Sequence, residues 1–278
     1  LIYRYTAAMP HSELPPYIAS ENRTTVDGVV ALEPVGQFFR VFSRNQLGVT
    51  FRDHPFHPFV LLADPGLADA VPVATRRHRL KGNGGLCWLV QLDSWRDWCL
   101  LREHLQQLHR PGEWFALQES SQQFLVASGI TCFKGLEAGD LKSLCITVSV
   151  SQPDVMMTGQ DQYKNAAITA IAVSDGAYFD ELISAERLTE PELLRRLTMI
   201  IQEQDPDIIT GYHLSAHDLP CLVSRARRHG VRLAWGRNGA EPCLSYMTEH
   251  NDGRPRYDVY GRILLDTWNL VHQYDRQI

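Results

Sequence analysis

Three residues that can bind metal ions or transfer protons lie close together in the second half of the chain: His213, His217 and Asp218. On a helix, a spacing of four residues would place both histidines on one face, as in many zinc sites. The segment, however, reads as the end of a strand followed by a loop. Two histidines without a third firm ligand are more often surface or hydrogen-bonded residues, so a transition-metal site is the weaker alternative.

Asp218 also has a purely structural explanation. It precedes Leu219-Pro220, and an aspartate at such a position accepts hydrogen bonds from the free N–H groups of a helix that starts there. We therefore expect Asp218 to cap a helix, with a residual metal role as the alternative. Asp266 ends an apolar stretch and is expected to satisfy a backbone turn rather than bind metal.

Residues 222–238 contain several arginines and no acidic residue. Because the net charge is -5, any contact with nucleic acid must come from such local basic clusters rather than from the total charge. The alternative is a solvated helix face balanced by acids elsewhere. The basic clusters are Arg225, Arg227, Arg228, Arg232 and Arg237 in the second half, and Arg76, Arg77, His78, Arg79 and Lys81 in the first.

The composition is that of an ordinary globular protein. A chain of 278 residues with 44% hydrophobic and 21% charged residues is long enough for two domains. No apolar run approaches the length of a membrane span, and the N-terminus has no signal pattern. The six cysteines form no C-x-x-C pair, which favours a reduced, cytoplasmic protein without a thiolate zinc site and without membrane contact.

The elements that must position these residues fall into two parts. Residues 1–138 read as β-rich, with one helix expected over 94–109, where Ser94 can cap the start. Residues 139–278 alternate strands and helices. Strands are expected over 144–150, 167–173, 208–211 and 262–266, and helices over 189–204 and 219–229. The order β-β-α-β-α-β predicts a layered α/β domain with a mixed sheet.

The second part resembles the exonuclease domain of family B DNA polymerases. Residues 205–212 read D-P-D-I-I-T-G-Y and residues 217–220 read H-D-L-P, similar to the second exonuclease motif of that family, P-D-(I/V)-I-x-G-(Y/H)-N-x-x-x-F-D-x-P. Residues 261–266, G-R-I-L-L-D, are similar to the strand that follows this motif. A weaker likeness, H-P-F-V-L at 57–61, extends to the N-terminal region. The resemblance implies a ribonuclease H-like fold preceded by the family's β-rich N-terminal domain.

The same resemblance implies a proofreading site with two divalent metals held by carboxylates, and this chain departs from it. The family's first motif supplies Asp-x-Glu on the opening strand, but the matching positions here are Thr147 and Ser149, which carry no charge. In the second motif only Asp218 is kept, while His213 and His217 replace asparagine and phenylalanine. Hard cations such as Mg²⁺ require charged oxygen ligands. We therefore expect Thr147, Ser149 and Asp218 to form a degenerate, catalytically inactive site.

Three functions follow as alternatives. The first is a non-catalytic exonuclease-like module that binds DNA or braces a polymerase core, in the same chain or in a separate subunit, during DNA replication or repair. The second is an interaction or assembly subunit derived from a polymerase. The third is an active 3′-5′ exonuclease with displaced ligands. No cofactor is expected, and Mg²⁺ only with residual nuclease activity or a polymerase core. The first alternative predicts DNA phosphate contacts by Arg225, Arg228, Arg232 and Arg237.

Overall fold

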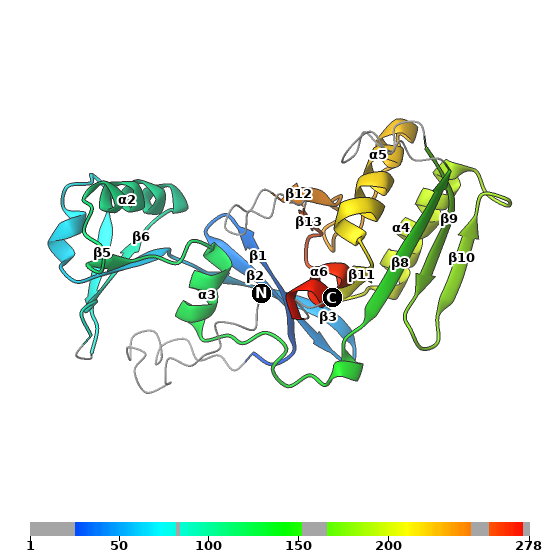
Figure 1. Cartoon of the computed structure of the whole chain (residues 1–278). Helices are drawn as coiled ribbons and strands as arrows, with labels where there is room; N and C mark the ends of the chain where they lie inside the picture. The colour runs from blue at the N-terminus through cyan, green and yellow to red at the C-terminus, as the bar shows by residue number, and fades with distance from the viewer. Residues whose placement is uncertain (1–25, 82–83, 152–165, 246–255, 275–278) are drawn as a thin grey trace. The chain divides into compact units, whose positions relative to one another are not determined.

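The computed structural model describes residues 26–81, 84–151, 166–245 and 256–274. It divides into two compact units, Leu1–Gly135 and Leu136–Ile278, which are coloured from blue to green and from green to red in Figure 1. The division falls three residues before the boundary expected from the sequence. Among the residues described, no helix is long and apolar enough to cross a membrane.

The first unit contains two antiparallel sheets. Strands β1 (Val29–Val35), β2 (Phe38–Asn45) and β3 (Gly48–Pro55) form one sheet, on which α3 (Ser120–Ser128) packs Phe124 against Phe39. The other sheet has the order β5-β6-β4-β7 and is built from β4 (Phe59–Leu62), β5 (Thr75–Arg79), β6 (Trp88–Leu92) and β7 (Trp114–Phe115). This unit is β-rich, as the sequence predicts.

The predicted helix of the first unit is α2 (Trp95–Gln107). The hydroxyl of Ser94 accepts a hydrogen bond from the backbone N–H of Asp97 at 3.1 Å, so the expected N-terminal cap is present. The helix buries Trp98, Leu101 and Leu105 in a core cluster with Val60 and Val90 of the sheet. A short 3₁₀ helix, η1 (Pro65–Ala68), follows β4 in this unit, and another, η2 (Ala138–Asp140), lies at the start of the second unit.

The second unit is built on a five-stranded mixed sheet of order β10-β9-β8-β11-β14. Strands β8 (Ser143–Ser151), β9 (Ala167–Ser174) and β10 (Asp180–Ser184) pair antiparallel. Strand β11 (Ile208–Gly211) pairs in parallel with β8 on one side and with β14 (Ile263–Asp266) on the other. A small ribbon of β12 (Cys243–Ser245) and β13 (Arg256–Asp258) lies apart from this sheet. The α/β class with a mixed sheet is confirmed.

Helices α4 (Glu190–Gln204) and α5 (Leu219–His229) bury the apolar residues of this sheet, and both lie alongside it in Figure 1. The start of α4 is fixed by a capping box, in which the backbone N–H of Thr189 donates to Glu192 Oε2 at 2.7 Å. Leu193, Leu197 and Ile200 are fully buried, so the apolar face predicted for this helix is confirmed. A third helix, α6 (Thr267–Tyr274), follows β14 directly.

Candidate active site

Strand β8 presents the first-motif positions on one face of the sheet. Leu144 and Ile146 are buried in the core, while Cys145, Thr147 and Ser149 are exposed, as the alternation of a strand requires. Thr147 and Ser149 therefore share a face. The structure thus brings two hydroxyl groups to the strand positions where the family pattern has two carboxylates.

Asp218 lies against this strand. It ends a π-helical turn, η4 (Leu214–Asp218), that runs into α5, and it is only 8% exposed. The backbone N–H of Val148, between Thr147 and Ser149, favours the charged form of the Asp218 carboxylate. Burial, together with the nearby charge of Asp266, raises the pKa of Asp218 to about 7. Asp218 makes no side-chain capping hydrogen bond to α5, so the predicted capping role is wrong: the helix continues backward through the π-helical turn.

Asp266 pins the loop that leads to Asp218. Its Oδ1 accepts hydrogen bonds from the backbone N–H groups of His213 and Trp268, both at 3.1 Å, and its Oδ2 accepts one from Ser215 at 3.0 Å. The predicted role of Asp266 in a backbone turn is confirmed. These bonds hold His213 in the left-handed region at φ 59°, a conformation that non-glycine residues adopt rarely and often at functional sites.

The two candidate metal-binding histidines, His213 and His217, make contacts with other aromatic rings. The imidazole of His213 stacks on the Trp268 indole, with ring centroids 5.0 Å apart. His217 meets His213 edge to face at 5.2 Å. The segment is not the plain loop expected from the sequence, because the N–H of His217 donates to the carbonyl of His213 at 2.9 Å and opens the π-helical turn.

The residues at this site do not fit a pair of Mg²⁺ ions. A two-metal site needs several charged oxygen ligands around ions about 4 Å apart. Thr147 and Ser149 are neutral, and burial disfavours the charged form of Asp218. Asp266 uses both carboxylate oxygens on backbone N–H groups. Within the described ranges, no group of three or more His, Cys, Asp or Glu residues could hold a metal ion.

The structure separates the four arginines expected at DNA into two classes. Arg225 is 4% exposed and pairs with Glu190, its Nε lying 2.7 Å from Glu190 Oε1. Glu190 also accepts hydrogen bonds from the Ile168 N–H at 2.8 Å and from His229 Nε2 at 2.6 Å. Although burial opposes ionisation, these bonds lower the pKa of Glu190 to about 2. Burial and pairing argue against a direct phosphate contact by Arg225.

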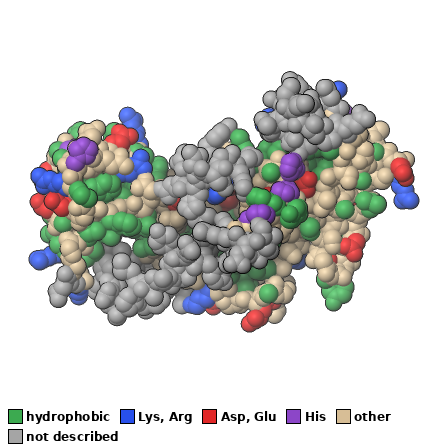
Figure 2. All heavy atoms as spheres, in the orientation of Figure 1, with side chains coloured by type: hydrophobic (Ala, Val, Ile, Leu, Met, Phe, Trp, Pro, Cys, Tyr) green, Lys and Arg blue, Asp and Glu red, His purple; other side chains and the backbone are tan. Residues whose placement is uncertain are grey.

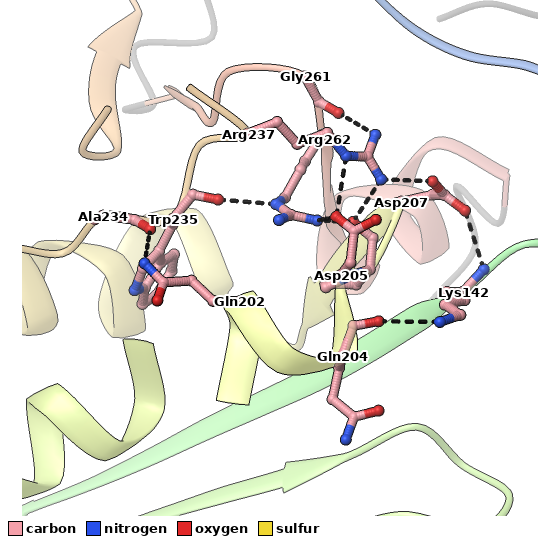
Figure 3. Close-up of polar contacts among 11 residues, drawn as sticks. Lys142, Gln202, Gln204, Asp205, Asp207, Ala234, Trp235, Arg237, Gly261 and Arg262 are labelled. Atoms are coloured by element: carbon pink, nitrogen blue, oxygen red, sulfur yellow. Dashed lines mark hydrogen bonds and ion pairs between the residues drawn. The ribbon is translucent and has the colours of Figure 1, made fainter. Parts of the chain in front are cut away.

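Arg237 belongs to a second buried ion network, shown in Figure 3. Its guanidinium contacts Asp207 at 2.8 Å and Asp205 at 3.1 Å, and Arg262 contacts the same Asp205 carboxylate at 2.7 Å. Asp207, which is fully buried, also accepts a hydrogen bond from the backbone N–H of Lys142 before β8. The network ties the starts of β8, β11 and β14 together, so Arg237 too is a structural residue.

The other two arginines are exposed. Arg228 lies in the last turn of α5, and Arg232 follows Gly230, which ends that helix at φ 62°. Because of this left-handed end, Arg232 does not continue the helical face of Arg225 and Arg228, contrary to the spacing argument. One Arg232 nitrogen donates to the Gly239 carbonyl at 2.8 Å.

Sequence reasoning missed Glu190 and Trp268. In the sequence, Glu190 was interpreted only as part of the start of a helix. Its partner Arg225 is distant in sequence, and the pairing depends on how α4 and α5 pack. Trp268 lies two residues after the motif aspartate Asp266, and that position was its only signal.

Comparison with known proteins places this geometry in a family. Residues 137–275 match the model of the family B DNA polymerase exonuclease domain. The chain therefore belongs to the family B DNA polymerases, and its second unit is their exonuclease domain. The first unit is included in a structural likeness to the family B DNA polymerase of Pyrobaculum calidifontis, with a TM-score of 0.65 and 20% identity over 88% of this chain and 36% of that one.

Curated relatives agree with this assignment. DNA polymerase 1 of Pyrococcus abyssi is 25% identical over 248 residues, covering 80% of this chain and 31% of the relative. A DNA polymerase of Pyrococcus glycovorans is 28% identical over 162 residues, covering 55% of this chain and 19% of the relative. The chain thus spans less than a third of the length of these polymerases.

Proposed function

We propose that the second unit is a nuclease-inactive exonuclease module that binds DNA, or braces a polymerase core, in DNA replication or repair. The observation that carries this proposal is the donor set on β8 and η4. Metal-assisted cleavage of a phosphodiester needs ions that activate water and neutralise the developing charge. The hydroxyl groups of Thr147 and Ser149 supply no charge for holding them.

Asp218 alone does not compensate for that loss. With a pKa of about 7, this carboxyl carries its full charge only above neutral pH. Restoring even one firmly bound cation would require a second carboxylate close by. The site is therefore poorly suited to hydrolysing a strand end.

DNA contact in this proposal comes from Arg228 and Arg232. Both are exposed, and they lie in the last turn of α5 and just after its C-terminal end. Guanidinium groups suit phosphate oxygens, because they donate planar pairs of hydrogen bonds. Such contacts carry little sequence preference and weaken steeply with salt. Arg225 and Arg237 are engaged in ion pairs inside the unit and are not part of this surface.

A polymerase core accompanies this module in the proposal, in the same chain or as a separate subunit. The relatives are DNA polymerases of which this chain matches 19–31%. Nucleotide addition, and the Mg²⁺ it uses, would belong to that core.

The proposal is tested by one binding and one cleavage assay on the purified chain. Fluorescence anisotropy with a labelled single-stranded oligonucleotide should give binding that weakens with salt. An Arg228→Ala/Arg232→Ala variant should reduce the slope of log K against log salt by about 0.7 per lost contact. The matched control is Arg187→Ala/Arg195→Ala, which removes the same charge from exposed positions near α4. Equal effects of the two variants would point to total charge rather than this surface.

In the cleavage assay, a 5′-labelled single strand should keep its length in the presence of Mg²⁺ or Mn²⁺. Metal-dependent shortening that disappears in Asp218→Asn would overturn the proposal and favour an active exonuclease. If neither oligonucleotide binding nor cleavage is detected, we would infer instead that the module is an assembly or interaction subunit.

A further inference from the structure

Strand β5 (Thr75–Arg79) forms one edge of the four-stranded sheet in the first unit, whose order is β5-β6-β4-β7. Each of its five residues pairs with a residue of β6. Among the residues that the structure describes, no strand pairs with the other side of β5. Alternate backbone N–H and C=O groups of an edge strand point away from the sheet, where they can bond to a further strand.

This edge carries an excess of positive charge. Four exposed cations lie between positions 76 and 81: Arg76, Arg77, Arg79 and Lys81. Arg76 contacts Asp93, and Arg77 contacts Asp69. Over the described ranges, neither Arg79 nor Lys81 has an acidic partner. Figure 2 shows lysine and arginine side chains on the surface of the part that holds β5 and α2, at the left of the view.

The two ion pairs at this edge do not block a new partner. The acidic side chains are 51% exposed at Asp93 and 63% exposed at Asp69. Exposed ion pairs contribute little stability, because water solvates both charges. An incoming carboxylate can therefore replace Asp93 or Asp69 with little loss of free energy.

The cations lie on both faces of the sheet. Residues that oppose each other in an antiparallel pair share a face. Arg77 and Arg79 oppose β6 residues that pack in the core cluster beneath α2, whereas Arg76, one position earlier, lies on the opposite face. A nucleic-acid backbone follows cations that line one groove, but the side chains of an added strand alternate between two faces. The arrangement therefore favours a peptide strand over a nucleic acid.

We propose that β5 binds an extended acidic segment of a partner protein, which adds a strand to this sheet. The main-chain hydrogen bonds of such a strand give affinity, and its side chains give specificity. Acidic residues opposite Arg76, Arg77 and Arg79 pair with these cations across the strands, whereas basic residues there are repelled. In an antiparallel strand this register requires the pattern acid-x-acid-acid. The same cations disfavour pairing with a second copy of this edge.

The test is a fluorescence anisotropy titration of the purified chain with three labelled peptides. The acidic peptide has the sequence Thr-Val-Glu-Val-Glu-Glu-Val-Thr, the second peptide replaces each Glu by Gln, and the third replaces each Val by Pro. The Gln peptide should bind about tenfold more weakly than the acidic one, because it lacks the cross-strand ion pairs. The Pro peptide should bind at least about tenfold more weakly, because proline has no N–H to donate to the ladder.

Variants of the chain test the same contacts from the other side. Arg77→Glu/Arg79→Glu should weaken binding of the acidic peptide at least about tenfold, because attraction becomes repulsion. The matched control is Arg96→Glu/Arg110→Glu, which reverses the charge of two exposed arginines elsewhere in the same unit. It should change the affinity less than about twofold, since salt screens distant charges. Circular dichroism should give the same spectrum for both variants and the parent.

Hydrogen exchange reports strand addition directly. The bound acidic peptide should protect those β5 amides that point away from β6. Equal binding of the acidic and Pro peptides without this protection would show charge attraction alone and overturn the proposal, as would no binding of the acidic peptide. An oligonucleotide that binds more tightly than the acidic peptide, and is lost in Arg77→Glu/Arg79→Glu, would assign the edge to nucleic acid instead. The proposed function concerns the second unit, so the two proposals stand or fail separately.

Discussion

Two regions of the second unit use residues of the same family motifs in opposite ways. In the ion network of Figure 3, the motif residues Asp207 and Arg262 are present, buried and paired. On β8, Thr147 and Ser149 stand where we expect the two first-motif carboxylates of the family, and neither side chain carries a charge. Asp207 and Arg262, which match the family, hold backbone, whereas Asp218 is the one carboxylate kept at the expected metal site. The fold therefore does not depend on the metal site.

The ion network gives the largest expected effect. Arg262→Met removes a guanidinium that contacts Asp205 and the carbonyl of Trp235. The change breaks an ion pair whose arginine is buried, leaves Asp205 to Arg237, and takes this donor from the Trp235 carbonyl. Removing one partner of a buried pair typically costs about 3–5 kcal/mol. Urea unfolding should show this loss, and the exposed control Arg228→Met should stay within about 0.5 kcal/mol of the parent. A small effect at Arg262 would mean that the network is not required for the fold.

Asp218 gives the next effect, and its sign depends on pH. Its folded pKa of about 7 lies above the ordinary value of 3.8, so the folded state binds more protons than the unfolded state between these values. Stability should therefore fall as pH rises from about 4 to 7. Asp218→Asn should remove this dependence and stabilise the chain at pH 8 by up to about 4 kcal/mol. The gain should shrink toward pH 4. A variant less stable than the parent at pH 8 would show that the charged carboxylate is needed.

A substitution at Gly211 tests the close packing of β11 on β8, with a smaller expected effect on stability. A Cβ at this position would lie 2.6 Å from the carbonyl oxygen of Ile146 on β8, so the two strands would have to move apart. Gly211→Ala should cost about 1–3 kcal/mol, as overpacking does. Gly139 has open space around its Cβ position, and Gly139→Ala should be nearly neutral. Equal melting temperatures for the two variants would contradict the close packing of β11 on β8.

The sequence predicted the second unit well because its signals are local. The capping box at Thr189, the apolar spacing of α4 and the turn at Asp205 each depend on neighbouring residues, and the structure agrees with all three. The expectation that Thr147 and Ser149 stand at the first-motif positions came from the resemblance to the family, and strand alternation explains why the two side chains share a face.

The arginines were harder to place because their roles depend on distant partners. Arg225 is paired with Glu190, 35 positions away, and Arg237 with Asp207, 30 positions away. The segment 222–238, which contains arginines and no acidic residue, was expected to be exposed. Arg225 and Arg237 are instead paired with acidic residues from other parts of the fold. The role of Asp218 was predicted wrongly for a related reason. A π-helical turn has no reliable sequence signature, so the helix was expected to begin at Leu219 and to need a cap, whereas helical backbone already begins at Leu214.

The most direct test of the central claim is to look for metal between β8 and η4. Crystals of the parent chain and of a Thr147→Asp/Ser149→Glu variant would be soaked in Mn²⁺, and the ions located by anomalous scattering. We expect no Mn²⁺ beside Thr147, Ser149 and Asp218 in the parent, and bound Mn²⁺ in the variant that carries both carboxylates. Two Mn²⁺ ions within about 4 Å of each other at this place in the parent would contradict it.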